Sequence, residues 1–229
     1  MGSNYRMEYN VDIVMCIDAT YSMVGLLDTV KQHALTFYGD LKAAMEKKGK
    51  VMASEMRVRV IAYRDYLADG DKAMLTTDFF SLPRDSAMFE RVIKSIEPFG
   101  GGDDPEDGLE ALAYAIKSPW SKGGTKRRHV VIVWTDASTH PLGFGAEAPN
   151  YPKKMARSFE ELSNWWGDAA QPGLMENNAK RLVIYAPEEE YWTTITNNWD
   201  NVVLYPSEAG NGLQELEYNQ ILAAIVNSI

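Results

Sequence analysis

The sequence lacks the cysteine pairs needed for internal disulfides and the long apolar runs needed for a membrane span. It contains a single cysteine, Cys16, so no disulfide can form within it, and the apolar residues around Cys16 favour a buried, unreactive thiol. It has no run of the roughly 18 apolar residues that a membrane span needs, and its first residues lack the apolar core of a signal peptide. We therefore expect a cytoplasmic protein. Residues 1–8 are expected to be a tail, consistent with an expression scar, and residues 9–229 to form one domain.

Positive charge is also scarce. Lys and Arg number 23 against 32 Asp and Glu, which gives a net charge of −9. Nucleic acids and anionic membranes are bound mainly by clustered cations, so neither is an expected partner. The one basic cluster, Lys126–Arg128, is short, and we expect it to lie in a solvated loop before a strand. With 45% hydrophobic residues and no low-complexity tract, the chain is expected to fold throughout.

Strand-like and helix-like segments alternate along the whole chain. Residues 11–17 and 129–136 are mostly apolar, as expected of central strands that are buried on both faces. Further strands are expected at residues 56–66, 74–80, 181–186 and 201–206, and helices at 22–48, 84–96, 106–118, 158–170, 188–198 and 213–229. This alternation predicts a Rossmann-like, doubly wound α/β fold, in which a mostly parallel sheet of about six strands carries helices on both faces.

Three acidic segments fall where strands give way to loops or helices: DATYS, GGGDDPED and DAST. In a parallel sheet such segments gather at the carboxyl edge, where ligands bind. An aspartate after a strand is often only a helix cap, but five carboxylates in one crevice would repel one another unless a cation or many hydrogen bonds offset their charge. These carboxylates are Asp18, Asp103, Asp104, Glu106 and Asp136.

The side chains of these segments favour a hard cation. Their leading positions carry carboxylates and hydroxyls without cysteine or histidine, and such oxygen ligands suit Mg²⁺, Mn²⁺ or Ca²⁺ rather than zinc; Mg²⁺ is the first choice. A turn after a strand can aim alternate residues at one point. Thr20 and Ser22 could then bind the ion directly, and Asp18 directly or through water. Tyr21 and Met23 are expected to point away and pack.

At these residues the chain resembles von Willebrand factor A domains that carry a metal-ion-dependent adhesion site. The shared motif is D-x-T-x-S after a central strand, then a glycine-rich acidic loop and a later strand-terminal Asp. The nearest likeness is to the corresponding domain of integrin β subunits, in which D-x-S-Y-S-M and D-S-P-E stand in the places of DATYSM and DDPE here. The order of elements agrees from Tyr9 to Ile229.

The resemblance implies a role for each of these residues around the metal. Its three loops would be Asp18, Thr20 and Ser22; then Asp103, Asp104 and Glu106; and finally Asp136. Glu106 matches a carboxylate that reaches the metal, and Asp103 matches one that serves a neighbouring cation. The second loop departs from the family, because it lacks the usual threonine and has Gly101 where integrins have an Asn.

The resemblance also implies a function. In this family a partner's Asp or Glu generally completes the coordination of the metal, so we expect a non-enzymatic protein-binding module whose partner presents an acidic residue. The local charge agrees, since an acidic crevice would reject such a partner unless an ion inverted its field. The amphipathic pattern runs to Ile229, so the module could belong to a longer parent chain or a larger complex.

Two alternatives stay open from the sequence. The chain could instead be a Mg²⁺-dependent phosphohydrolase with Asp18 as the nucleophile, although such enzymes have a second acidic residue at the position of Thr20. His140 could then be a general base, a partner contact or a structural residue. In a scaffold subunit the metal site would be vestigial, and partners would bind at the tryptophan-rich residues 163–170 and 189–199, although most of these tryptophans are expected to be packed.

Overall fold

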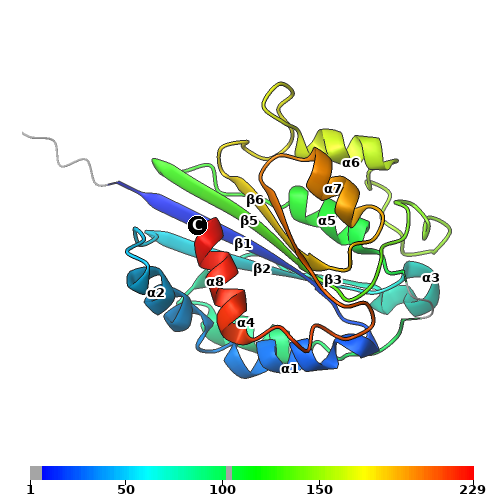
Figure 1. Ribbon diagram of the computed structural model, residues 1–229, viewed down its shortest axis with the longest axis horizontal. Coiled ribbons are helices and arrows are strands. Elements are labelled where there is room, and N and C mark those ends of the chain that lie inside the picture. The colour runs from blue at the N-terminus through cyan, green and yellow to red at the C-terminus, as the bar shows by residue number, and fades with distance from the viewer. Residues whose placement is uncertain (1–6, 102–104) are drawn as a thin grey trace, which may run out of the picture.

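The computed structural model describes residues 7–101 and 105–229. Within them, a seven-stranded sheet lies between two layers of helices (Figure 1). The strands are β1 (Tyr9–Asp18), β2 (Glu55–Tyr63), β3 (Met74–Thr76), β4 (Phe80–Leu82), β5 (Lys126–Trp134), β6 (Lys180–Ala186) and β7 (Val202–Pro206). The helices are α1 (Val24–His33), α2 (Phe37–Lys47), α3 (Tyr66–Asp69), α4 (Ser86–Ser95), α5 (Gly108–Ile116), α6 (Phe159–Trp166), α7 (Trp192–Asn198) and α8 (Tyr218–Ser228).

The sheet is mixed and mostly parallel, which confirms the predicted fold class. Its strand order is β3-β2-β1-β5-β6-β7, and β4 also pairs with β2. All neighbouring pairs are parallel except those of β3 and β4 with β2. Since β1 lies at the centre, nine of its ten residues are buried. Its nearly continuous apolar run therefore suits a strand that is covered on both faces.

Alternate residues of β1 face two separate cores. Ile13, Met15 and Ile17 pack with α1, α2, α4 and α8, whereas Val14 and Cys16 pack with α5, α6 and α7. Figure 1 shows these two helical layers on opposite faces of the sheet. The expectation that Cys16 is buried is confirmed. No helix in the described part of the chain is both long and apolar enough to cross a membrane.

Several predicted boundaries need correction. The helix predicted over residues 22–48 is two helices, α1 and α2, separated at residues 34–36. The strand predicted over residues 74–80 is replaced by two short antiparallel strands, β3 and β4. Helix α8 begins at Tyr218 rather than at residue 213, because a capping box of Glu217 and Gln220 satisfies its first backbone N–H groups.

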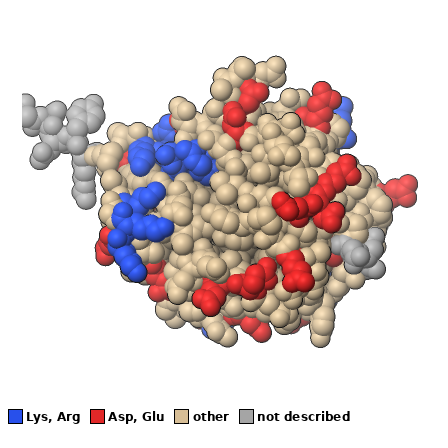
Figure 2. Space-filling model, in the orientation of Figure 1, with Lys and Arg blue, Asp and Glu red and all other residues tan. Residues whose placement is uncertain are grey.

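The basic cluster Lys126–Arg128 is the start of β5 rather than a solvated loop. Its residues pair in parallel with Tyr9, Asn10 and Val11 of β1, so the ladder extends through the cluster. On the face shown in Figure 2, basic side chains gather near the amino end of β1, and acidic side chains predominate toward the opposite end. The carboxyl ends of the parallel strands thus lie at the more acidic end of this face.

Candidate metal centre

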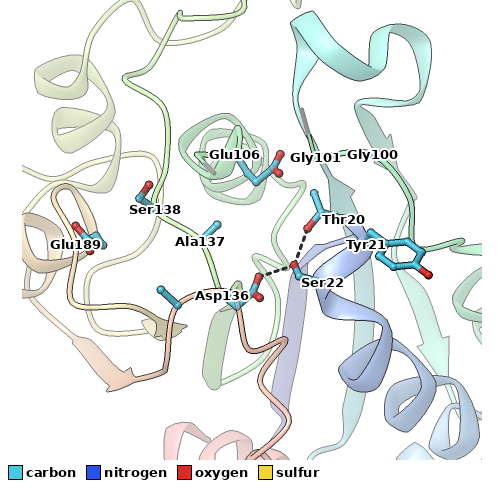
Figure 3. Close-up of a pocket in the computed structure, with 12 residues that line it drawn as sticks. Thr20, Tyr21, Ser22, Gly100, Gly101, Glu106, Asp136, Ala137, Ser138 and Glu189 are labelled. Carbon is cyan, nitrogen blue, oxygen red and sulfur yellow. Dashed lines mark hydrogen bonds between the residues drawn. The ribbon is translucent and has the colours of Figure 1, made fainter. Parts of the chain in front are cut away.

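A pocket of about 550 Å³ lies at the carboxyl edge of the sheet, where the loops after β1 and β5 meet (Figure 3). Thr20, Ser22, Glu106 and Asp136 line it, and Asp18 lies beneath Thr20. The structure therefore brings together five of the seven residues that the sequence predicts to surround a metal. The other two, Asp103 and Asp104, lie outside the described residues.

The Asp18 carboxylate at the end of β1 is fully buried and is held from two sides. Its Oδ1 accepts hydrogen bonds from the backbone N–H of Thr20 at 2.9 Å and from Thr20 Oγ1 at 2.6 Å. Its Oδ2 accepts one from Thr135 Oγ1 at 2.7 Å. Burial raises the pKa of Asp18 to about 6, although the hydrogen bonds from the two threonines oppose that rise.

Ser22 links the first loop to the third. Its Oγ donates to Asp136 Oδ1 at 2.9 Å and lies 3.3 Å from Thr20 Oγ1, as the dashed lines in Figure 3 show. Asp136 Oδ2 accepts from the backbone N–H of Gly212 at 2.7 Å, so the β7–α8 loop also supports the site. Three oxygen groups, Thr20 Oγ1, Ser22 Oγ and the Asp136 carboxylate, are thereby placed side by side.

Substituting Gly212 with alanine is expected to destabilise the protein by at least about 2 kcal/mol and to weaken metal binding. Gly212 has a φ of +63°, and a Cβ there would lie 2.2 Å from the carbonyl oxygen of Ser22. Gly210 has a similar φ of +70° with open space around its Cβ, so Gly210→Ala should cost only about 1 kcal/mol. Urea denaturation of both variants separates the effect of the clash from that of the backbone conformation. Equal losses of unfolding free energy in the two variants would contradict this interpretation.

Glu106 enters the pocket from the segment before α5. Its backbone pairs with Thr139, and its N–H donates to the carbonyl of Ser138. Gly101 passes so close that a Cβ there would lie 3.2 Å from Glu106 Oε1. The side chain is only 3% exposed, yet its Oε2 has no hydrogen-bond partner among the described residues.

The charge of the Glu106 carboxylate is poorly compensated. Burial and the nearby charges of Asp18, Asp65, Asp69 and Asp107 raise the pKa of Glu106 to about 10. A buried carboxylate oxygen without a partner costs several kcal/mol when ionised, unless a cation approaches it. The donor set of two hydroxyls and two carboxylates, with an unsatisfied oxygen among them, therefore fits a hard divalent cation.

The Asp18 carboxylate is poorly placed for nucleophilic attack. Both of its oxygens already accept hydrogen bonds, and its side chain is absent from the pocket lining. His140 is buried and bonded to Asp65 rather than facing the pocket, which agrees with a structural role better than with a general base. Trp166 and Trp192 are fully buried, as expected, so the tryptophan-rich segments form core more than surface.

Met23 is buried as expected, but Tyr21 is 73% exposed and stands at the mouth of the pocket (Figure 3). The expectation that Tyr21 packs is therefore wrong. A tyrosine in the short 3₁₀ turn Tyr21–Met23 projects outward, while Met23 on the same turn faces the core. The exposed ring gives the pocket rim an aromatic surface.

The sequence assigned no role to Thr135, Asp65 or Asp107, and it offered His140 only as a general base, a partner contact or a structural residue. Thr135, one residue before Asp136, positions Asp18. Asp65, Asp107 and His140 form a buried group whose ligand atoms lie within 4.8 Å of one another, an arrangement that could hold a metal ion. Asp65 lies two residues after β2 and Asp18 is the last residue of β1, so the same signal of an acid near the end of a strand was available for Asp65.

Comparison with known proteins supports the fold. No protein-family model matches the chain, and no curated protein matches it. Among solved structures, the pilus adhesin SpaC from Lactobacillus rhamnosus GG matches 98% of this chain with 11% identity and a TM-score of 0.54. Proximal thread matrix protein 1 from the mussel byssus matches 95% of it with 13% identity and a TM-score of 0.49.

The matched regions are parts of larger proteins. This chain covers 31% of the SpaC chain and 46% of the byssal protein. At such low identity, the likeness to SpaC concerns the fold alone. The chain therefore shares with a pilus adhesin an α/β fold built on a mixed, mostly parallel sheet.

Proposed function

We propose that this chain is a non-enzymatic protein-binding module that captures an acidic residue of a partner protein through a divalent metal ion. The observation that carries the proposal is the meeting of oxygen donors from three distant loops at one open pocket. These donors belong to Thr20, Ser22, Glu106 and Asp136, and Asp18 holds Thr20 from beneath.

Mg²⁺ is the ion that best suits this donor set, with Mn²⁺ or Ca²⁺ as substitutes, because all the donors are hard oxygens. The ion would supply positive charge and an open coordination position at the pocket. The rim includes Glu189, which would repel an acidic partner in the absence of the ion. Tyr21 at the mouth offers apolar contact area around the captured carboxylate.

The residue pattern of the von Willebrand factor A adhesion site and the fold likeness to an adhesin both support this proposal. The deep burial of Asp18 favours capture over phosphoryl transfer, in which Asp18 would have to attack the substrate. The scaffold alternative differs in requiring no ion at all.

Selection from a random peptide library tests the proposal. We expect peptides selected on the immobilised protein in Mg²⁺, and released by chelator, to be enriched in Asp or Glu. Ser22→Ala, which removes one donor hydroxyl, should capture at least about tenfold fewer of them, whereas the exposed-site variant Asp200→Asn should behave as wild type.

Two outcomes would overturn the proposal. Peptides that remain bound in chelator, or that show no acidic enrichment, would favour the scaffold alternative. Turnover of an aryl phosphate that depends on Mg²⁺ and is lost in Asp18→Asn would favour the hydrolase.

A further inference from the structure

Three buried side chains meet behind the pocket, each from a different part of the fold. Asp65 follows β2 and caps α3, Asp107 directly precedes α5, and His140 lies in the loop after β5. They are 2%, 0% and 4% exposed, and one ligand atom from each lies within 4.8 Å of the others. A solvated surface cluster of acids would not have this degree of enclosure.

The surrounding structure already orients these groups. Asp65 Oδ1 accepts from the backbone N–H of Ala68 at 2.6 Å, while its Oδ2 lies 2.8 Å from His140 Nε2. Asp107 Oδ2 accepts from the backbone N–H of Tyr66 at 2.6 Å. The imidazole stacks on Phe144, with 3.8 Å between ring centroids. Such supporting contacts fix the rotamers of metal ligands and reduce the entropy lost on binding.

The charge around this group is unusual for a protein interior. Glu106 and Glu110 are buried beside it, and each has a carboxylate oxygen with no hydrogen-bond partner in the described structure. The buried Arg64 directs its donors to four backbone carbonyls instead. By contrast, the buried Asp12 is paired with Arg57 through two hydrogen bonds of 2.7 Å. Unlike Asp12, Glu106 and Glu110 therefore each keep a buried carboxylate oxygen that no cation in the described structure contacts.

We propose that Asp65, Asp107 and His140 form a second metal site, which binds a first-row transition ion of the Zn²⁺ type. Two carboxylates and one imidazole suit such an ion, whereas Mg²⁺ and Ca²⁺ prefer oxygen ligands alone. Three protein ligands with a fourth position for water is a common Zn²⁺ arrangement. The site uses none of the groups that line the pocket.

Binding of an ion would change the distances between these ligand atoms. Ligand atoms about 2.0–2.1 Å from a tetrahedral Zn²⁺ lie about 3.3 Å apart. Asp65 Oδ2 and His140 Nε2, now 2.8 Å apart, would separate by about half an ångström as the ion displaces the proton between them, and the more distant pairs would close.

This ion would stabilise the two chain segments that carry Glu106 and Asp136 into the pocket. Asp107 is adjacent to Glu106 in the chain, and His140 follows Asp136 by four residues. Tying these two segments to Asp65 would limit their movement and hold Glu106 and Asp136 in place. The second site is independent of the proposed capture function, because it needs neither Mg²⁺ nor an acidic partner.

Titration of the metal-free full chain with Co²⁺ and Zn²⁺, in an excess of Mg²⁺, tests this site. We expect one equivalent of Co²⁺ to bind with the visible absorption of a low-coordinate ion, and Zn²⁺ to displace it and raise the Tm. His140→Gln and Asp107→Asn should each weaken Zn²⁺ binding at least about tenfold. Ser22→Ala should retain it, and so should His33→Gln, which replaces a histidine on α1.

Failure of Co²⁺ and Zn²⁺ to bind, or binding that is lost in Ser22→Ala and retained in His140→Gln, would overturn the second site without affecting the capture proposal. If the variants do not fold, X-ray absorption of the Zn²⁺-bound wild type decides. Scattering from one imidazole would support the site, and its absence would exclude it, since His140 is the only imidazole in the group.

Discussion

Replacing Glu106 with glutamine is expected to abolish Mg²⁺ binding while raising the free energy of unfolding of the metal-free protein by about 3 kcal/mol at pH 7. Glutamine keeps the size of the side chain and removes a buried carboxylate that has no compensating cation. The same change thus removes a ligand for the metal and a source of instability in its absence.

The expected gain in unfolding free energy follows from the direction in which the pKa of Glu106 is shifted. The pKa of Glu106 is raised from its ordinary value of 4.5 to about 10 in the folded protein. Between these values the folded state holds a proton that the unfolded state releases, so the stability of the wild type falls as the pH rises through this range. Glutamine does not titrate. The advantage of Glu106→Gln should therefore be absent below about pH 4 and grow with increasing pH.

Urea denaturation in chelator, repeated between pH 4 and pH 8, measures this difference, and calorimetry measures Mg²⁺ binding. The exposed Glu147→Gln is the matched control and should change neither quantity. In Mg²⁺ the order should reverse, because only the wild type gains stability from the bound ion. A Glu106→Gln protein that is less stable than wild type in chelator would show that the carboxylate is compensated in a way the structure does not reveal.

Asp18→Asn is expected to weaken Mg²⁺ binding by about 10- to 100-fold with little loss of structure. The amide oxygen can still accept from Thr20, and the amide NH₂ can donate to Thr135 Oγ1 in place of the present bond. What disappears is the negative charge that polarises the Thr20 hydroxyl toward an ion. The fold should persist because these hydrogen bonds can be replaced.

Calorimetric titration with Mg²⁺ at pH 8, where Asp18 is ionised, measures the loss, and circular dichroism checks the fold. Asp200→Asn, at an exposed aspartate before β7, serves as the control. The affinity of the wild type should also rise between pH 5 and pH 8, since the ion competes with the protons of Asp18, whose pKa is about 6, and of Glu106, whose pKa is about 10. Unchanged affinity in Asp18→Asn would remove Asp18 from the site.

The core elements of the fold could be predicted because their signals are local. The apolar run that contains Cys16 required a strand buried on both faces, and the alternation of strands with helices required a parallel sheet. The break between α1 and α2 escaped prediction because the helical spacing continues through residues 34–36. The place of Lys126–Arg128 in β5 was not predicted either, because pairing with β1 outweighed the preference of charged residues for loops.

The residues of the candidate site also fall into those that local sequence predicted and those that it did not. Asp18, Thr20 and Ser22 lie within five residues, so the geometry of one turn predicted that they act together. Thr135 gave no such signal, since a threonine at the end of an apolar strand is ordinary. His140 and Asp65 are 75 residues apart in sequence, and no local pattern relates them.

The sequence by itself determined the central strands and placed Asp18 and Asp136 at their carboxyl ends, because side-chain alternation and burial act over a few residues. Only the tertiary structure decided which of those acids meet. The placement of β1 between β2 and β5 sets Asp18 beside Asp136, and packing across the sheet encloses Asp65, Asp107 and His140 together. Such contacts depend on strand order and layer packing, which are properties of the whole chain.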